Sequence, residues 1–296
     1  MEENINALLI DFDASPDWKF FDGLNHSAKN WIIEKKESNW SQKKKINNFK
    51  RYYTYFVFSI SKFFQIKKYK KIVAWQQFYG LFLCFFIKIL RKKSDVQIIL
   101  LTFIYKEKKG IIGKLYKFFI KTSLKCKNLK KVVVLSKYEI DYYAKKLGMP
   151  KDKFEFLKIG ISKMPKFKIV KGDYFLSVGR SNRDYDFLVN SFRNSAYKLI
   201  ILSDTYKNNN LPKNIIINDN CFDDDFEKLL AQSFAIVISL NDEPISSGQL
   251  VVNYAYVYHK PVIVTNNPGI IDYVDDKVNG YVIEKKKKNC LMLLTN

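Results

Sequence analysis

Two short polar segments of the sequence combine glycine with residue types that bind anions. They read "SVGRSNRD" (177–184) and "NDEPISSG" (241–248), and each follows an apolar run. Their candidate ligand-binding residues are Gly179, Arg180, Arg183, Ser246, Ser247, Gly248 and, directly after, Gln249. Guanidinium groups and backbone N–H groups bind phosphate, and glycine permits close approach. The pattern indicates a pyrophosphate-bearing ligand, although glycine at strand ends also serves turn geometry alone.

A second group of polar residues follows the first apolar runs of the chain. Asp11 and Asp13 end the run "NALLIDFD", and a carboxylate there is a candidate general base, with Asp13 as our choice. The alternative is an acid that caps a helix or a turn. Gln76 and Gln77 follow an expected strand at 71–75, and we expect them to contact acceptor or donor hydroxyls.

Histidine and cysteine give no further site. His26 and His259 have no Ser or Cys partner at a recognisable spacing, so a hydrolase triad is not supported. The four cysteines form no C-x-x-C pair, which favours reduced thiols and argues against zinc.

The N-terminus is acidic and lacks the basic region of a signal peptide. The longest apolar run, 78–90, is shorter than the roughly 20 residues of a membrane span. These observations predict a cytoplasmic protein.

Charge divides the chain into two unequal parts. Residues 1–170 hold 37 lysines and arginines against 14 acidic residues, a difference of +23, whereas 171–296 hold 14 against 15, a difference of −1. The basic part suits nucleic acid, an anionic membrane surface or an anionic substrate. Segments 58–71 and 85–93 mix phenylalanine with lysine, and we expect them to lie on an anionic membrane leaflet. The alternative is that they form buried helices whose lysine side chains extend to the solvent. No specific nucleic-acid motif is present.

Apolar runs that alternate with helical patterns predict a parallel α/β protein. Expected strands and helices alternate from residue 6 to 161 and again from 173 to 284, with 13–25 as a loop and 269–280 as a short helix. The polar, basic stretch 162–172 is the expected linker. We therefore expect two Rossmann-like parallel-sheet domains, at 1–165 and 166–296.

Three ordered blocks of the sequence resemble the family-4 type glycosyltransferases with the GT-B fold (glycosyl transferases group 1). The longest is 245–284, where Lys260-Pro261-Val262, Pro268-Gly269 and Val278-Asn279-Gly280 occur in the family's order. Segments 175–192 and 132–161 resemble the opening block of the family's C-terminal domain and the last block of its N-terminal domain. The first 130 residues resemble the family only in their alternation of expected strands and helices.

The resemblance implies a GT-B enzyme whose two domains face a cleft. It implies a nucleotide-diphosphate sugar as donor substrate, a glycan or lipid-linked acceptor in bacterial surface polysaccharide synthesis, and hexosyl transfer with retention. It implies no cofactor and no obligatory metal, and peripheral attachment to the inner membrane face. The basic N-terminal domain would serve the acceptor and the C-terminal domain the donor.

The sequence departs from the family at its two glutamates. Their places hold Ser246 and Tyr254, with Glu243 upstream as a candidate substitute in catalysis and Tyr254 as a ribose contact. Packing of the helix is the alternative role of Tyr254. A C-terminal domain shorter than that of the family is also expected. The alternatives for the whole chain are a GT-B-like binding protein without catalysis and a basic nucleic-acid-binding protein.

Overall fold

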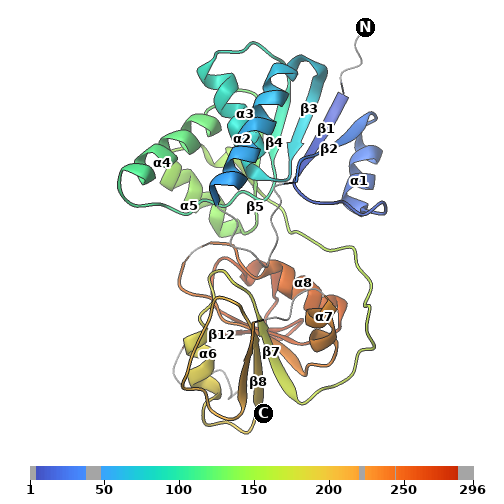
Figure 1. Ribbon diagram of the computed structural model, residues 1–296, viewed down its shortest axis with the longest axis vertical. Coiled ribbons are helices and arrows are strands. Elements are labelled where there is room, and N and C mark those ends of the chain that lie inside the picture. Colours follow the sequence, from blue (N-terminus) through green and yellow to red (C-terminus); the bar gives the residue numbers. More distant parts are fainter. Residues whose placement is uncertain (1–4, 38–47, 220–223, 244, 286–296) are drawn as a thin grey trace. The chain divides into compact units, whose positions relative to one another are not determined.

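The structure is a computed structural model that describes residues 5–37, 48–219, 224–243 and 245–285 (Figure 1). It divides into two compact units, unit 1 at residues 1–157 and unit 2 at 158–296. The division falls between Leu157 and Lys158, upstream of the boundary expected between 165 and 166. Much of the expected linker is attached to unit 2, since the main-chain N–H of Lys166 donates to the Tyr258 hydroxyl.

Unit 1 is built on one parallel six-stranded sheet of order β2-β1-β3-β4-β5-β6. The strands are β1 (Ile5–Ile10), β2 (Trp31–Lys35), β3 (Tyr69–Ala74), β4 (Gln97–Leu100), β5 (Leu129–Val134) and β6 (Phe154–Phe156). The helices between them are α1 (Lys19–Ser27), α2 (Asn48–Phe64), α3 (Gln77–Ile89), α4 (Gly110–Leu124) and α5 (Lys137–Leu147), with single 3-10 turns η1 (Ile66–Lys68) and η2 (Lys151–Lys153).

Alternate residues of each strand in unit 1 serve the two faces of the sheet. Ala7 and Leu9 of β1 pack in the large core beneath α2, α3, α4 and α5, while Leu8 and Ile10 pack in a smaller cluster with α1. A strand places successive side chains on opposite faces, so a strand covered on both sides is apolar throughout. All four of these β1 residues are fully buried.

Unit 2 repeats the architecture with strand order β12-β11-β10-β7-β8-β9, all pairs parallel. Its strands are β7 (Tyr174–Val178), β8 (Lys198–Leu202), β9 (Ile215–Asn218), β10 (Ala235–Ile238), β11 (Val262–Thr265) and β12 (Tyr281–Ile283). Its helices are α6 (Tyr185–Phe192), α7 (Asp224–Ala231) and α8 (Gln249–Val257), with one 3-10 turn η3 (Ile271–Tyr273). Helix α6 packs its buried residues against Phe175, Leu199 and Val237 of the sheet.

Two expected elements differ from the structure. The segment 13–25, expected as a loop, contains most of α1, whose Phe20, Phe21 and Leu24 cover the sheet. Pro16 and Gly23 suggested a loop, but Pro16 lies ahead of the helix and Gly23 is exposed on its outer side. The expected helix at 269–280 is reduced to the single turn η3.

Each sheet reverses its strand order once, and this positions the functional residues. In unit 1 the chain leaves β1 for β2 and returns to the opposite side of β1 at β3; in unit 2 it leaves β7 for β8 and returns beside β7 at β10. Loops after adjacent strands at such a point lead to opposite faces of the sheet, which opens a crevice at the carboxyl ends. The residues predicted at 11–13, 76–77, 179–183 and 241–248 all follow these strands.

We predict that Gly80→Ala lowers the free energy of unfolding by about 1–3 kcal/mol, because a Cβ there would overlap packed atoms. It would lie 2.1 Å from Leu100 Cδ2 and 2.9 Å from Ala74 Cβ, where α3 crosses the sheet. Gly23→Ala is the matched helical control: its Cβ meets nothing within 4 Å, so we expect a gain of up to about 1 kcal/mol. Urea denaturation compares the two, and equal effects would contradict this view of the α3 contact.

Candidate functional site

The guanidinium of Arg183 lies between two glycines at the reversal point of unit 2. Gly179 follows β7 with φ +143°, and Gly248 precedes α8 with φ +91°. A Cβ on Gly179 would lie 2.6 Å from the Arg183 guanidinium, and one on Gly248 would lie 3.7 Å from Arg183 Nη2. Other residues rarely adopt these backbone angles. The backbone conformation therefore requires glycine at both positions. The absence of a Cβ atom at these positions also leaves room for the Arg183 guanidinium.

Hydrogen bonds fix this guanidinium across both loops. Arg183 Nε donates to the Val178 carbonyl at 3.1 Å, and Nη1 donates to the Ser181 carbonyl at 3.0 Å and to Ser247 Oγ at 2.8 Å. The Ser247 hydroxyl donates in turn to the Ser181 carbonyl at 3.0 Å. Burial lowers the pKa of Arg183, yet arginine remains charged in proteins. The result is a fixed positive charge at the carboxyl ends of β7 and β10.

The two helices that begin beside Arg183 differ at their N-termini. Helix α6 is capped by Asp184, whose carboxylate accepts from the Phe187 N–H at 3.1 Å. Helix α8 begins after Gly248 with no side-chain cap. The first N–H groups of a helix have no partner within the helix and carry partial positive charge. The N-terminus of α8 is thus the end at which an anion can accept those hydrogen bonds.

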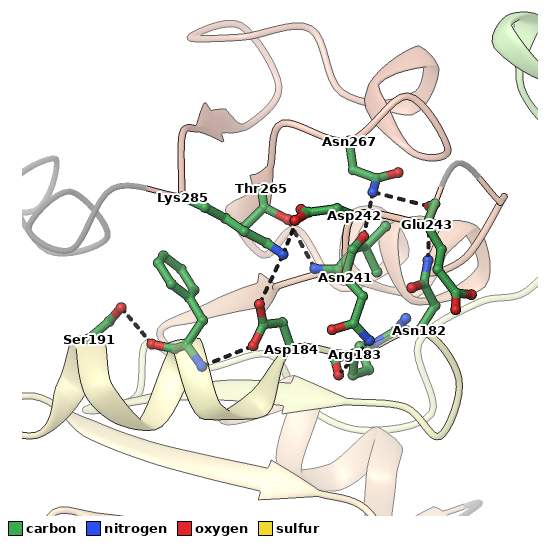
Figure 2. Close-up of polar contacts among 12 residues, drawn as sticks. Asn182, Arg183, Asp184, Ser191, Asn241, Asp242, Glu243, Thr265, Asn267 and Lys285 are labelled. Carbon is green, nitrogen blue, oxygen red and sulfur yellow. Dashed lines mark hydrogen bonds and ion pairs between the residues drawn. The ribbon is translucent and has the colours of Figure 1, made fainter.

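A polar network beneath the loops connects four strand ends (Figure 2). Asn267 Nδ2 donates to the Asn241 carbonyl at 2.7 Å and to the Glu243 carbonyl at 3.4 Å. Lys285, after β12, contacts Asp184 at 2.9 Å and Asp242 at 3.0 Å. These two carboxylates raise the pKa of the Lys285 ammonium, against the opposing effect of burial. The loop after β10 is therefore attached to the segments after β7, β11 and β12.

Three buried polar atoms near these strand ends have no hydrogen-bond partner among the described residues. They are Ser177 Oγ in β7, Asn182 Oδ1 in the following loop and Ser239 Oγ after β10. A buried group without a partner costs roughly 1–3 kcal/mol, and such groups gather at functional sites. Their common location supports the assignment of this edge as the site of unit 2.

Three predicted residues of this edge lie close to the Arg183 cluster. Arg180 Nε contacts Asp204 Oδ1 at 2.7 Å, after β8, so its guanidinium is directed to a different partner from that of Arg183. Ser246 is buried with 5 % of its surface exposed. The main-chain carbonyl of Glu243 accepts from Asn182 Nδ2 at 3.5 Å, while its side chain is half-buried.

Gln249 and Tyr254 make other contacts in the structure. The Gln249 amide is buried and donates to the Gly269 carbonyl. The Tyr254 ring packs edge-to-face on Phe226 of α7, with centroids 5.4 Å apart, and Lys163 Nζ lies 5.2 Å from its centroid. Gln249 thus makes a hydrogen bond to the main chain and Tyr254 a ring contact, and neither contact is to the Arg183 cluster.

At the reversal point of unit 1, three side chains form a hydrogen-bonded cluster. Asp11 Oδ2 accepts from the Tyr55 hydroxyl at 3.0 Å and from Gln76 Nε2 at 3.0 Å, and Gln76 Nε2 also donates to the Tyr55 hydroxyl at 3.1 Å. Gln76 Oε1 accepts from the Phe78 N–H and so caps α3. Burial raises the pKa of the neighbouring Tyr79, with further contributions from Asp11 and Tyr55. Asp11 thus has one oxygen held by protein donors.

The other two predicted residues of unit 1 are outside this cluster. Asp13 is exposed and forms an ion pair with Lys35, which holds the pKa of Asp13 below its usual value. The Gln77 amide donates to the Ile104 carbonyl at 3.2 Å and accepts from the Ile104 N–H at 3.1 Å, which attaches α3 to the segment after β4.

Sequence reasoning missed Tyr55 and the asparagines that support the loops. Tyr55 belongs to "RYYTYFVFS", where nothing in the pattern distinguishes it from its tyrosine neighbours. Only the placement of α2 on the sheet directs this hydroxyl to Asp11. Asn182 gave a usable signal, since it directly follows Gly-Arg-Ser in the first polar segment; in the structure it adopts φ +54°.

Solved structures of glycosyltransferases share this fold. Sucrose-phosphate synthase from Thermosynechococcus elongatus matches with a TM-score of 0.68 and 15 % identity over 99 % of this chain and 90 % of that one. HepE of Anabaena, in complex with UDP and glucose, matches with a TM-score of 0.59 and 12 % identity over 98 % and 81 %. WaaG, a glycosyltransferase involved in lipopolysaccharide biosynthesis, matches with 0.57 and 13 % over 95 % and 86 %.

The fold is the GT-B glycosyltransferase fold. The expected fold class is thereby confirmed, and it is consistent with the group 1 glycosyltransferases that the sequence blocks resemble. No model of a known family matches the sequence, and no curated protein matches it. Among the described residues, no group of three or more His, Cys, Asp or Glu side chains is placed to hold a metal ion. In the same part of the chain, no helix is long and apolar enough to span a membrane.

We predict that Arg183→Lys destabilises unit 2 by about 1–3 kcal/mol, because an ammonium cannot make all the hydrogen bonds of the planar guanidinium. Arg193→Lys is the control, since Arg193 is an arginine of the same unit that donates at the surface to the Asn210 carbonyl. Thermal unfolding measures both variants. Equal stability of Arg183→Lys and the wild type would show that Arg183 does not hold the two loops together.

Proposed function

We propose that this chain is a glycosyltransferase that moves a sugar from a nucleotide-diphosphate sugar to a glycan or lipid-linked acceptor. One observation carries the proposal: the N-terminus of α8, which lacks a side-chain cap, lies beside the fixed Arg183 charge at the reversal point of unit 2. A GT-B fold adds support, as does HepE, a neighbour in complex with UDP and glucose. Unit 2 would bind the donor and unit 1 would serve the acceptor.

The departing nucleoside diphosphate needs positive potential that is already in place when the sugar bond breaks. Arg183, Arg180 and the first N–H groups of α8 would supply it, and the Ser247 hydroxyl would donate to phosphate or sugar oxygens. Such donors cost no reorganisation during the reaction. This arrangement requires no metal ion to stabilise the leaving group. Transfer of a hexosyl unit with retention is part of the proposal through the resemblance to group 1 enzymes.

On the acceptor side, the proposal assigns the leading role to Asp11. Its Oδ2 is held by Tyr55 and Gln76, and no described residue donates a hydrogen bond to Oδ1. A carboxylate oxygen in that position can accept a hydrogen bond from an acceptor hydroxyl and orient it. Asp13 remains an alternative, although its ion pair with Lys35 competes for that role.

The acceptor class follows from the charge of unit 1 and from a neighbour. Unit 1 holds 33 lysines and arginines against 14 acidic residues, which suits an anionic acceptor or an acceptor carried on an anionic membrane surface. WaaG is described as involved in lipopolysaccharide biosynthesis. We therefore propose surface polysaccharide or lipid-linked glycan synthesis, with the chain attached peripherally to the inner face of the membrane.

We expect one nucleoside diphosphate among UDP, GDP and CDP to raise the melting temperature, with a shift that grows with ligand concentration. Arg180→Ala should weaken binding of that nucleotide at least about tenfold. A hydrogen bond from a charged guanidinium to a phosphate contributes roughly 1.5–3 kcal/mol to binding. Arg193→Ala is the control for loss of an arginine from unit 2. Calorimetric titration measures the affinities.

The outcomes of this titration separate the alternatives. No shift with any nucleotide from a cooperatively folded sample would overturn the proposed donor site. Binding of a nucleotide sugar without turnover or hydrolysis would identify a GT-B-like binding protein. Salt-sensitive oligonucleotide binding without nucleotide-sugar binding would favour a nucleic-acid partner instead.

A second prediction concerns the two acids of unit 1. Asp11→Asn should lower kcat by about 10²-fold or more while the donor affinity stays unchanged, because the amide cannot accept a proton. Asp13→Asn, at the same strand end, should lower kcat less than about threefold, or roughly 0.7 kcal/mol of barrier, because Asp13 is exposed and paired with Lys35 outside the cluster. Donor hydrolysis or transfer assays measure kcat. The reverse ranking would move the catalytic role to Asp13.

A further inference from the structure

We propose that Arg51 and Lys108 form a subsite for a phosphate group that the acceptor carries. Arg51 lies in the first turn of α2, and Lys108 lies two residues before α4 begins. Both helices begin at the carboxyl edge of the parallel sheet, where the Asp11 cluster also lies. The inference rests on the proposed transfer, which brings an acceptor hydroxyl to Asp11, and it adds the chemical group by which that acceptor is selected.

The guanidinium of Arg51 has no acidic partner in the part of the chain that the structure describes. Its Nε atom is buried without a hydrogen-bond partner there, and no described carboxylate forms an ion pair with it. A buried donor without a partner is costly in free energy, and such donors gather at functional sites. Arg51 is also one of only two arginines in unit 1, and the other, Arg91, is exposed.

Two tyrosine rings hold this guanidinium beside the Asp11 cluster. Arg51 Cζ lies 5.6 Å from the centroid of the Tyr52 ring and 5.9 Å from that of the Tyr55 ring. A cation–π contact fixes the position of a cation without cancelling its charge, because the ring is neutral. The Tyr55 hydroxyl donates to Asp11 Oδ2 at 3.0 Å. The ring of Tyr55 therefore separates a carboxylate at its hydroxyl end from a cation over its face.

Lys108 is a second cation at the same place. Its Nζ atom lies 5.9 Å from the centroid of the Tyr52 ring. The acid next to it in the sequence, Glu107, contacts Lys117 at 3.2 Å and Lys146 at 2.5 Å. Lys108 itself is exposed and forms no ion pair with a described residue. Two cations that no described acid neutralises thus meet at one tyrosine ring.

The charge and the geometry of this pair favour phosphate. A phosphate monoester carries a charge of roughly −1.5 to −2 at neutral pH, which two cations balance, whereas a carboxylate carries a single charge. The planar guanidinium of Arg51 can bind two phosphate oxygens at once, and the ammonium of Lys108 adds a point charge. The acceptor would be a sugar whose hydroxyl reaches Asp11 Oδ1 while its phosphate contacts these two cations. That phosphate belongs either to a sugar phosphate or to the diphosphate of a lipid-linked sugar.

Calorimetric titration of the full chain tests the subsite. The probes are glucose 6-phosphate and farnesyl diphosphate, which represent the two sources of phosphate. The nucleoside diphosphate that raises the melting temperature is added first, so that the donor site is filled and does not take up the probes. We expect at least one phosphate probe to bind, and we expect glucose, which lacks the phosphate, to bind at least about tenfold more weakly.

Four single variants locate the binding. Arg51→Lys should weaken the bound probe at least about tenfold although the charge is kept, because an ammonium cannot bind two oxygens as the guanidinium does. Arg91→Lys makes the same change at the exposed arginine of unit 1 and should leave the affinity unchanged. Lys108→Gln should weaken the probe about threefold or more. Lys125→Gln removes the same charge at the opposite end of α4 and should have a smaller effect.

Four results would overturn the inference. They are a folded wild type that binds neither phosphate probe, glucose that binds as tightly as glucose 6-phosphate, glucuronate that binds as tightly as glucose 6-phosphate, and an Arg51→Lys variant that binds like Arg91→Lys. Circular dichroism checks that all variants are folded.

The nucleotide titration reports separately on the proposed transfer. A nucleotide that binds while both phosphate probes fail overturns the subsite alone. If no nucleotide binds, the probes are titrated without one, and binding that depends on Arg51 then supports the subsite while the proposed donor site is overturned.

Discussion

The Arg183 guanidinium occupies space that two missing side chains leave open, and the site of unit 2 depends on this contact. Gly179 and Gly248 supply the space and adopt backbone angles that other residues rarely take. The guanidinium then joins the end of β7 to Ser247, which lies two residues before the start of α8. An arginine that stays charged and is already held by three acceptors loses little entropy when an anion arrives.

The reversal of strand order explains why both units carry a polar cluster at one edge. Loops that leave adjacent strands toward opposite faces cannot fill the space between them, so side chains from distant parts of the sequence meet there. At this edge unit 2 has arginine, serine and asparagine, which are residue types that can bind a phosphate. At the corresponding edge unit 1 has Asp11, Tyr55 and Gln76, which can form hydrogen bonds with a hydroxyl group. The same backbone plan therefore places different residue types at the strand ends of the two units, and the proposed donor and acceptor roles rest on those residues.

The two units differ in charge and in exposed apolar surface, and unit 1 has more of both. Unit 1 holds the excess of lysine and the exposed apolar residues Ile111, Ile112, Leu115 and Phe118 of α4, whereas unit 2 is close to neutral. The aromatic and lysine pattern of 58–71 and 85–93 first suggested a membrane surface. In the structure Phe63, Ile66 and Ile87 of these segments are buried in the core, whereas Phe64, Ile89 and Leu90 are exposed.

The sequence by itself determined the fold class, the strand ends that carry polar residues and the asymmetry of charge. These follow from local patterns, since strand–helix alternation and glycine placement are written in neighbouring residues. Tertiary structure alone decided which side chains meet. Gln249 and Tyr254 were predicted as donor contacts from their place after the second polar segment, and in the structure their side chains contact the Gly269 carbonyl and the Phe226 ring. Tyr55 lies 44 residues from Asp11 and reaches it only because α2 crosses the sheet. Contacts of this kind depend on how helices seat on the sheet, which no short stretch of sequence encodes.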